Sequence, residues 1–246
     1  LVSAFCADDA YDWDTGFRGT GQYWFTIQGS DTAGRAGELD GFDLTTDENA
    51  DEFSDPVVTN VTWIGSGVGS GATTDAAFRM RAGGAGEFYN SIFTDFPDAA
   101  VRIDDDDSAN QRFVDGDITI RNNVFFDFGA GSDIPSIVVD GNGETNGNGN
   151  TRDEQLDADN VFQNPQLGGI SRARDEGLDP RANAGDLPSE ELKADFVNSS
   201  ADGSDDFPGV DLGPIQDAGF VGAFEPGAAL WTTGWTKLST EGYMVE

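Results

Sequence analysis

Short apolar runs separated by turn-forming residues recur along the first two thirds of the chain. The clearest are QYWFTIQG, PVVTNVTWIG, AAFRMRAG, GEFYNSIFTDF, AAVRID, GDITIRNNVFFDFG and SIVVDG. Most carry a strand-length core of aromatic and β-branched residues bounded by Gly, Asp, Asn or Ser, which is typical of β-strands. Helical periodicity is nearly absent, and the best helix candidate is residues 187–196, with Ser189 as its N-cap. The pattern therefore predicts an all-β protein.

Two of these runs form an internal repeat. EFYNSIFTDF and TIRNNVFFDF align without a gap and pair Asn90 with Asn122, Ile92 with Val124, Phe93 with Phe125, Asp95 with Asp127 and Phe96 with Phe128. Weaker copies surround Asn60 and Asn160. A strand, an Asn-containing bend and a second strand are typical of a rung in a right-handed parallel β-helix. We expect the asparagines to form a ladder at a left-handed bend, and Phe and Ile to stack in an inner column.

An antiparallel β-sandwich is the rival fold. It explains the strands but not the alignment of the Asn and Phe positions, so the solenoid is preferred. Strand patterns fade near residue 166, which predicts rungs over residues 1–166 and an irregular wrap over 167–246 of the same domain. We expect Trp231 and Trp235 to cap an open end of the core. The Gly- and Asn-rich residues 140–155 suggest a flexible or calcium-binding loop.

Charge and composition exclude several functions. The 13 Lys and Arg against 46 Asp and Glu give a net charge of −33, and the chain has no histidine. Nucleic acid is excluded as a partner, because neutralising phosphates requires a basic face. Such acidity fits a salt-adapted protein, since molar salt shortens the screening length to about 3 Å. The single cysteine, Cys6, cannot form an internal disulfide, and we expect no membrane span.

Three segments carry a family resemblance: LVSAFCADDAYDWDTGFRGTGQYWFTIQG, GGAGEFYNSIFTDFPDAAVRI and VGAFEPGAALWTTGWTKLS. They resemble a family of large secreted right-handed parallel β-helix proteins, uncharacterised lipoproteins of Bacteroidetes-type bacteria. The resemblance implies an extracellular or cell-surface location and further rungs before residue 1. It implies no particular reaction.

The stretch DDAYDWDTGFRG places Asp8, Asp9, Asp12 and Asp14 around two aromatic residues. Alternation puts Tyr11 and Trp13 on one face, which favours a strand and a corner with carboxylates outside. A calcium site made by the four aspartates is the second interpretation, because hard oxygen ligands suit calcium. The acidic run 104–107 is a weaker candidate for calcium and more typical of a solvated loop.

Catalysis is the least favoured interpretation of this stretch. Arg18, Arg102 and Arg121 are candidates for the base of a calcium-dependent lyase, as in pectate lyases, but none lies in a lyase signature. Trp24 or Trp63 would be able to stack on sugar rings if it were exposed. We favour packing of both tryptophans in the core.

These observations predict a secreted or cell-surface structural protein without an activity of its own. Self-association through the solenoid ends, into a filament or lattice, follows if an end rung is open. The alternative is a carbohydrate-active β-helix, either a calcium-dependent polysaccharide lyase or a module that binds surface glycans. A groove lined by exposed aromatic residues, an arginine and convergent carboxylates along one sheet would favour that alternative, and its absence would exclude it.

Overall fold

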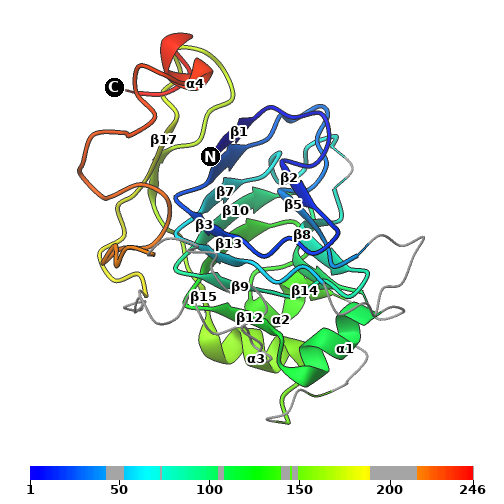
Figure 1. Cartoon of the computed structure of the whole chain (residues 1–246). Helices are drawn as coiled ribbons and strands as arrows, with labels where there is room; N and C mark the ends of the chain where they lie inside the picture. Colours follow the sequence, from blue (N-terminus) through cyan, green and yellow to red (C-terminus); the bar gives the residue numbers. More distant parts are fainter. Residues whose placement is uncertain are drawn as a thin grey trace.

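A computed structural model describes residues 1–42, 53–72, 74–104, 108–139, 145, 149–188 and 215–245. Most of the helix expected over residues 187–196 lies outside the described residues. The chain winds through stacked rungs, and the first four rungs each contribute one strand to each of three parallel sheets (Figure 1). The fold is therefore a parallel β-helix, as the sequence pattern predicted.

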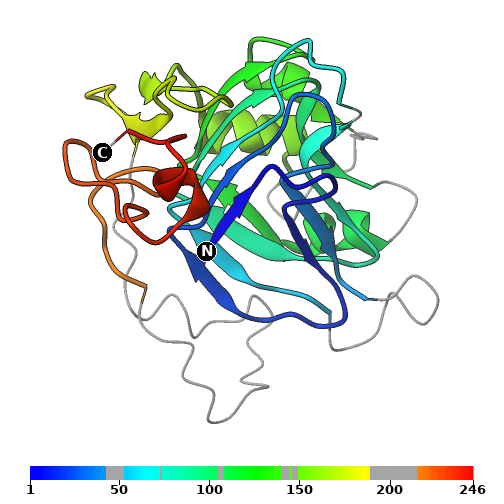
Figure 2. The same ribbon diagram turned by 90° about the horizontal axis from the view of Figure 1, so that it is seen from above.

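Within these three sheets, paired strands come from successive rungs, so consecutive strands of the chain are not paired with each other. Sheet A contains β1 (Val2–Ala4), β4 (Phe25–Ile27), β7 (Thr62–Ile64), β10 (Ile92–Phe96), β13 (Val124–Phe128) and β15 (Val161–Phe162). Sheet B contains β2 (Tyr11–Trp13), β5 (Gly37–Asp40), β8 (Ala76–Arg81), β11 (Ala99–Ile103) and β14 (Val138–Val139). Sheet C contains β3 (Thr20–Gln22), β6 (Val57–Thr59), β9 (Gly86–Tyr89) and β12 (Ile118–Arg121). Seen from above, the three sheets enclose the core (Figure 2).

The repeat found in the sequence is confirmed by the register of sheet A. Phe93 pairs with Phe125, and their rings stack inside the solenoid with centroids 5.2 Å apart. Ile92 pairs with Val124, but these two side chains pack outward against Ala182 and Val221 of the C-terminal segment. The expectation that Ile shares the inner column with Phe was therefore wrong. Successive strand residues alternate between faces, and here both faces are buried.

The bend between sheets C and A uses left-handed backbone in successive rungs. Asn60, Asn90 and Asn122 have φ between 49° and 55°, which confirms that these asparagines mark the bend. Asn160 departs from the predicted alignment, because the pairing of Val124 with Val161 places it beside Asn123. The buried ladder runs through this next position. Oδ1 of Asn123 accepts from Ser91 N at 3.0 Å, and Oδ1 of Asn160 accepts from Asn123 N at 3.0 Å.

Helices close the end of the solenoid that lies below β12 in Figure 1. They are α1 (Ser108–Asp115), α2 (Ile134–Ile137) and α3 (Arg152–Asp159). Phe113, Ile134 and Leu156 from these helices join the same core cluster as the inward phenylalanines. Residues 152–155, expected in a loop, thus begin α3 at a Thr151–Glu154 capping box. Residues 140–144 and 146–148 of that expected loop lie outside the described residues.

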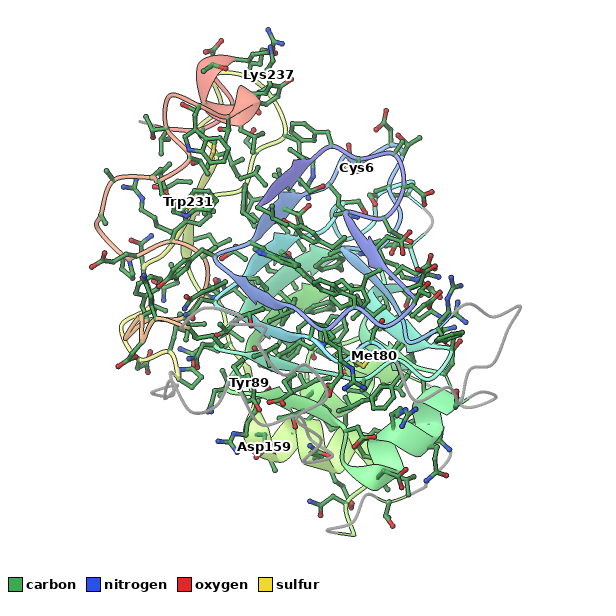
Figure 3. All side chains as sticks on the ribbon, in the orientation of Figure 1. Cys6, Met80, Tyr89, Asp159, Trp231 and Lys237 are labelled. Atoms are coloured by element: carbon green, nitrogen blue, oxygen red, sulfur yellow. The ribbon has the colours of Figure 1, made fainter. Side chains whose placement is uncertain are left out.

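The C-terminal segment covers the outer face of sheet A. It contains β16 (Leu167–Gly169), β17 (Asp179–Ala182) and α4 (Lys237–Thr240). Phe224 contacts Phe25 edge-on at 5.1 Å, and Trp231 stacks on Phe224 at 5.4 Å. Trp231 therefore packs on the flank of the solenoid, as Figure 3 shows, and Trp235 is 62% exposed. The expected aromatic cap over an open end takes this flanking position instead, because the outward apolar residues of sheet A need cover.

Candidate functional site

The acidic opening stretch forms the strand and corner that its alternation predicted. In β2, Tyr11 and Trp13 are buried and Asp12 is exposed. The Tyr11 hydroxyl donates to the Phe25 carbonyl at 2.7 Å, and its ring stacks on Trp63 at 5.4 Å. Phe17 contacts Trp13 at 5.5 Å where the chain turns. The aromatic residues therefore anchor the first rung and direct Asp12 outward.

The four aspartates of the predicted calcium site have separate surroundings. Asp8 is exposed, Asp9 forms a 3.6 Å ion pair with Arg35, and Asp14 accepts from the Thr15 hydroxyl at 2.5 Å. Partial burial and then the charges of neighbouring aspartates raise the pKa of Asp12. Within the described part of the chain, no three acidic or cysteine side chains group as ligands of one metal ion. The calcium site stays a prediction.

Asp12 begins a column of charged residues on the outer face of sheet B. The strand register pairs Asp12 with Glu38, Glu38 with Arg79, and Arg79 with Arg102. Neighbouring strands lie about 4.8 Å apart, so these side chains emerge at one-rung intervals. A second pair, Asp40 and Arg81, stands beside the column. Parallel pairing thus brings together residues that are tens of positions apart in the sequence.

Ion pairs connect the column to the edge of the sheet. Arg35 Nε lies 2.6 Å from Asp75 Oδ1, and Arg35 Nη1 lies 2.8 Å from Glu38 Oε1. Asp75 is also 3.4 Å from Arg102 and 3.7 Å from Arg79. Asp75 is therefore shared by three arginines that come from three successive rungs.

The far side of the column is paired in the same manner. Arg79 forms a two-pronged contact with Asp104, at 2.8 Å from Nε and 2.6 Å from Nη2. Arg81 lies 2.6 Å from Asp40 and 3.1 Å from Glu38. Asp104, expected in a solvated acidic loop, is instead buried in this contact, whereas residues 105–107 lie outside the described residues. Two-pronged guanidinium–carboxylate contacts fix both planes in one orientation.

We call this surface the charged face of sheet B. Its members are Asp9, Asp12, Arg35, Glu38, Asp40, Asp75, Arg79, Arg81, Arg102 and Asp104. Oxygen- and nitrogen-tipped side chains gather on this side of the solenoid in Figure 3, opposite Trp231. In Figures 1 and 2, the C-terminal chain, drawn in orange and red, lies on the other side of the core from β2 and β5.

The electrostatics of this face bear on its chemistry. The hydrogen bond to Asp40 raises the pKa of Arg81 above its ordinary value. Burial raises the pKa of Asp75, but hydrogen bonding to Arg35 and the charges of three arginines outweigh it, and the net pKa is lowered. Burial raises the pKa of Glu38 and outweighs the charge of Arg81, which acts to lower it. Arg81 is thus held as a cation, which suits binding better than proton abstraction.

The three arginines proposed as lyase bases do not meet. Arg102 lies on the charged face, Arg121 lies on β12 of sheet C, and Arg18 lies over the ring of Phe53 at 4.7 Å. Trp63 is fully buried and Trp24 packs against the core, so core packing of these tryptophans is confirmed.

Sequence reasoning missed Arg35, Glu38, Asp75 and Arg79. The available signal was the two-residue spacing of Arg79 and Arg81 in AAFRMRAG and of Glu38 and Asp40 in GELD. That spacing places each pair on one face of a strand.

Comparison with known proteins identifies the fold family. None of the described helices has the length and apolar character needed to cross a membrane. No curated protein and no solved structure matches the chain. A family model described as a pectate-lyase-like β-helix domain matches residues 1–164, the segment that contains all the stacked strands. The chain therefore belongs to the family of pectate-lyase-like β-helix domains.

Proposed function

We propose that this domain is an extracellular or cell-surface β-helix that binds carbohydrate along the charged face of sheet B. One observation carries the proposal: arginines and carboxylates from successive rungs form a continuous, outward-facing network. Membership of the β-helix family is consistent with a carbohydrate-active or surface protein. The network supplies two of the features expected of a carbohydrate site, namely arginine and convergent carboxylates along one sheet.

The chemistry of the face suits sugar hydroxyls. Guanidinium groups donate several hydrogen bonds from a fixed plane, and carboxylates accept them. Ion pairing holds both in place before a ligand arrives, which lowers the entropic cost of binding. Because side chains recur about every 4.8 Å along the stack, an extended glycan lying across the rungs would meet similar groups repeatedly.

The net charge of −33 narrows the ligand class. An anionic polysaccharide would be repelled by this chain except at high ionic strength. We therefore propose a neutral glycan as the ligand. Calcium held by Asp8, Asp9, Asp12 and Asp14 would partly neutralise the acidic end of the face, and it remains our proposal for the cation.

Binding of neutral oligosaccharides by isothermal titration calorimetry tests this function, with acidic oligosaccharides compared in the same salt. Arg102→Gln should weaken binding, since it removes the guanidinium at the last position of the column, which lies 3.4 Å from Asp75. The matched control is Arg174→Gln, which makes the same change in charge at a C-terminal ion pair with Glu241. Equal binding by both variants, or no saturable binding by the parent chain across neutral glycans, would refute the proposal.

Assembly through the solenoid end is the second candidate function. The strands of the first rung, β1, β2 and β3, each pair on one side only in the described structure. Exposed strand edges accept further strands, from the same longer protein or from another chain. The proposal of a filament or lattice, in a salt-adapted surface protein, is tested by light scattering after size exclusion in high salt. A strict monomer at all concentrations would exclude self-association for this chain.

A further inference from the structure

A second set of equivalent positions lies at the ends of the sheet A strands, away from the charged face. Register places Gln28, Gly65, Asp95, Asp127 and Asn164 in one row, one residue from each of five successive rungs. Asp95 and Asp127 both have a φ of 64°, so the backbone is left-handed at each. We call this set the turn row.

The first three positions of the turn row are occupied by one guanidinium. Arg172 Nε donates to the Gln28 carbonyl at 2.8 Å, and Nη2 donates to the Gly65 carbonyl. The same Nη2 lies 2.6 Å from Asp95 Oδ2. The row therefore binds a cation where the C-terminal chain supplies one.

The remaining two positions face an open pocket of about 290 Å³. Its principal lining residues are Phe126, Asp127, Asn164, Gln166, Leu167 and Ile170. The Asp127 side chain is exposed and, among the described residues, its carboxylate makes no ion pair and no hydrogen bond, unlike that of Asp95 one rung away. Partial burial and the charge of Asp95 raise the pKa of Asp127. A bound cation would favour the charged carboxylate and so oppose this rise in the pKa of Asp127.

We propose that this pocket binds a small alkylguanidinium compound. Its guanidinium would pair with Asp127 as Arg172 pairs with Asp95, through a charge-assisted hydrogen bond from one guanidinium nitrogen to one carboxylate oxygen. The ring of Phe126 offers a face for cation–π contact, and Leu167 and Ile170 would contact the alkyl stem. The lining is about half polar and half apolar, which suits a ligand with a charged head and a short alkyl stem. The site is independent of the proposed glycan face.

Calorimetry of the whole chain with n-butylguanidinium tests the site. The titration is run in about 1 M NaCl, where the screening length of roughly 3 Å suppresses non-specific attraction to an acidic protein. The neutral isostere n-butylurea is the ligand control. Asp127→Asn is the test variant, since Asn tolerates the left-handed backbone of this residue. Asp157→Asn, at an exposed position on α3, is the control with the same change in net charge.

We expect saturable binding at one site by the parent chain and by Asp157→Asn. Asp127→Asn, or replacement of the ligand by n-butylurea, should weaken binding at least about tenfold, because a charge-assisted hydrogen bond is lost. Unsaturable binding, equal binding of the urea, or undiminished binding by Asp127→Asn would each overturn the proposal. Glycan binding to the charged face is measured separately, so that failure of one site is distinguished from failure of the other.

Discussion

Replacement of Asn123 by alanine should destabilise the solenoid at its buried side-chain ladder. Asn123 is fully buried, and its Oδ1 accepts from Ser91 N at 3.0 Å. Its Nδ2 donates to the Phe88 carbonyl at 2.9 Å and to Asn160 Oδ1 at 3.0 Å. Stranding the Ser91 N–H costs about 1–3 kcal/mol, and each lost donated bond about 1 kcal/mol. We therefore expect a loss of about 4 kcal/mol in the free energy of unfolding.

Urea unfolding at fixed high salt measures this loss, and hydrogen exchange of the Ser91 amide reports it locally. The control is Asn123→Ser, because Ser91 makes comparable hydrogen bonds at the same position one rung earlier. Ser91 Oγ accepts from Val61 N at 3.1 Å and donates to the Tyr89 carbonyl at 2.7 Å. Asn123→Ser should recover about half of the loss. A cost below about 1 kcal/mol for Asn123→Ala, or equal costs for both variants, would refute the reasoning.

Three further predictions concern the core, the pH dependence and calcium. Phe93→Ala should lower the free energy of unfolding in urea by about 4 kcal/mol, because a fully buried, stacked ring is lost. Trp235→Ala, at a 62% exposed position, should lower it by less than about 1 kcal/mol. Burial raises the pKa of Glu87, so the charged form destabilises the fold as pH rises through that raised pKa. Glu87→Gln should raise the melting temperature at pH well above the ordinary 4.5, with the gain vanishing below it. Millimolar calcium should raise the melting temperature in about 1 M NaCl, and EGTA should reverse the shift. A ligand at 100 times its Kd adds about 2.7 kcal/mol to the free energy of unfolding. Asp12→Asn should abolish this calcium-dependent shift. A calcium response unchanged in Asp12→Asn would place the ion elsewhere.

The rung alignment was predictable because like residues stack in a parallel solenoid. Phe93 and Phe125 pair as their sequence repeat requires, and the left-handed bend at Asn90 and Asn122 follows from asparagine's tolerance of that geometry. The direction of Ile92 was not predictable from the repeat. In a strand buried on both faces, apolar residues follow one another along the sequence. Their pattern therefore does not show which of them point into the solenoid and which point outward.

The helical end was hidden for a related reason. The sequence of α1, SANQRFVD, contains few apolar residues, and only a narrow stripe with Phe113 reaches the core. Its position is decided by the open end of the solenoid, which needs apolar cover. The capping box of Thr151 and Glu154 was the local signal that could have identified α3.

The sequence by itself determined that short strands stack in parallel rungs, that Tyr11 and Trp13 point inward from an acidic strand, and that the surface is strongly anionic. Only the tertiary structure decided which charges meet. Arg35 and Asp75 are 40 residues apart, and rungs of unequal length hide their proximity from any fixed spacing. The parallel hydrogen-bond register removes that uncertainty, because it sets each rung directly over the last and so brings distant arginines and carboxylates onto one face.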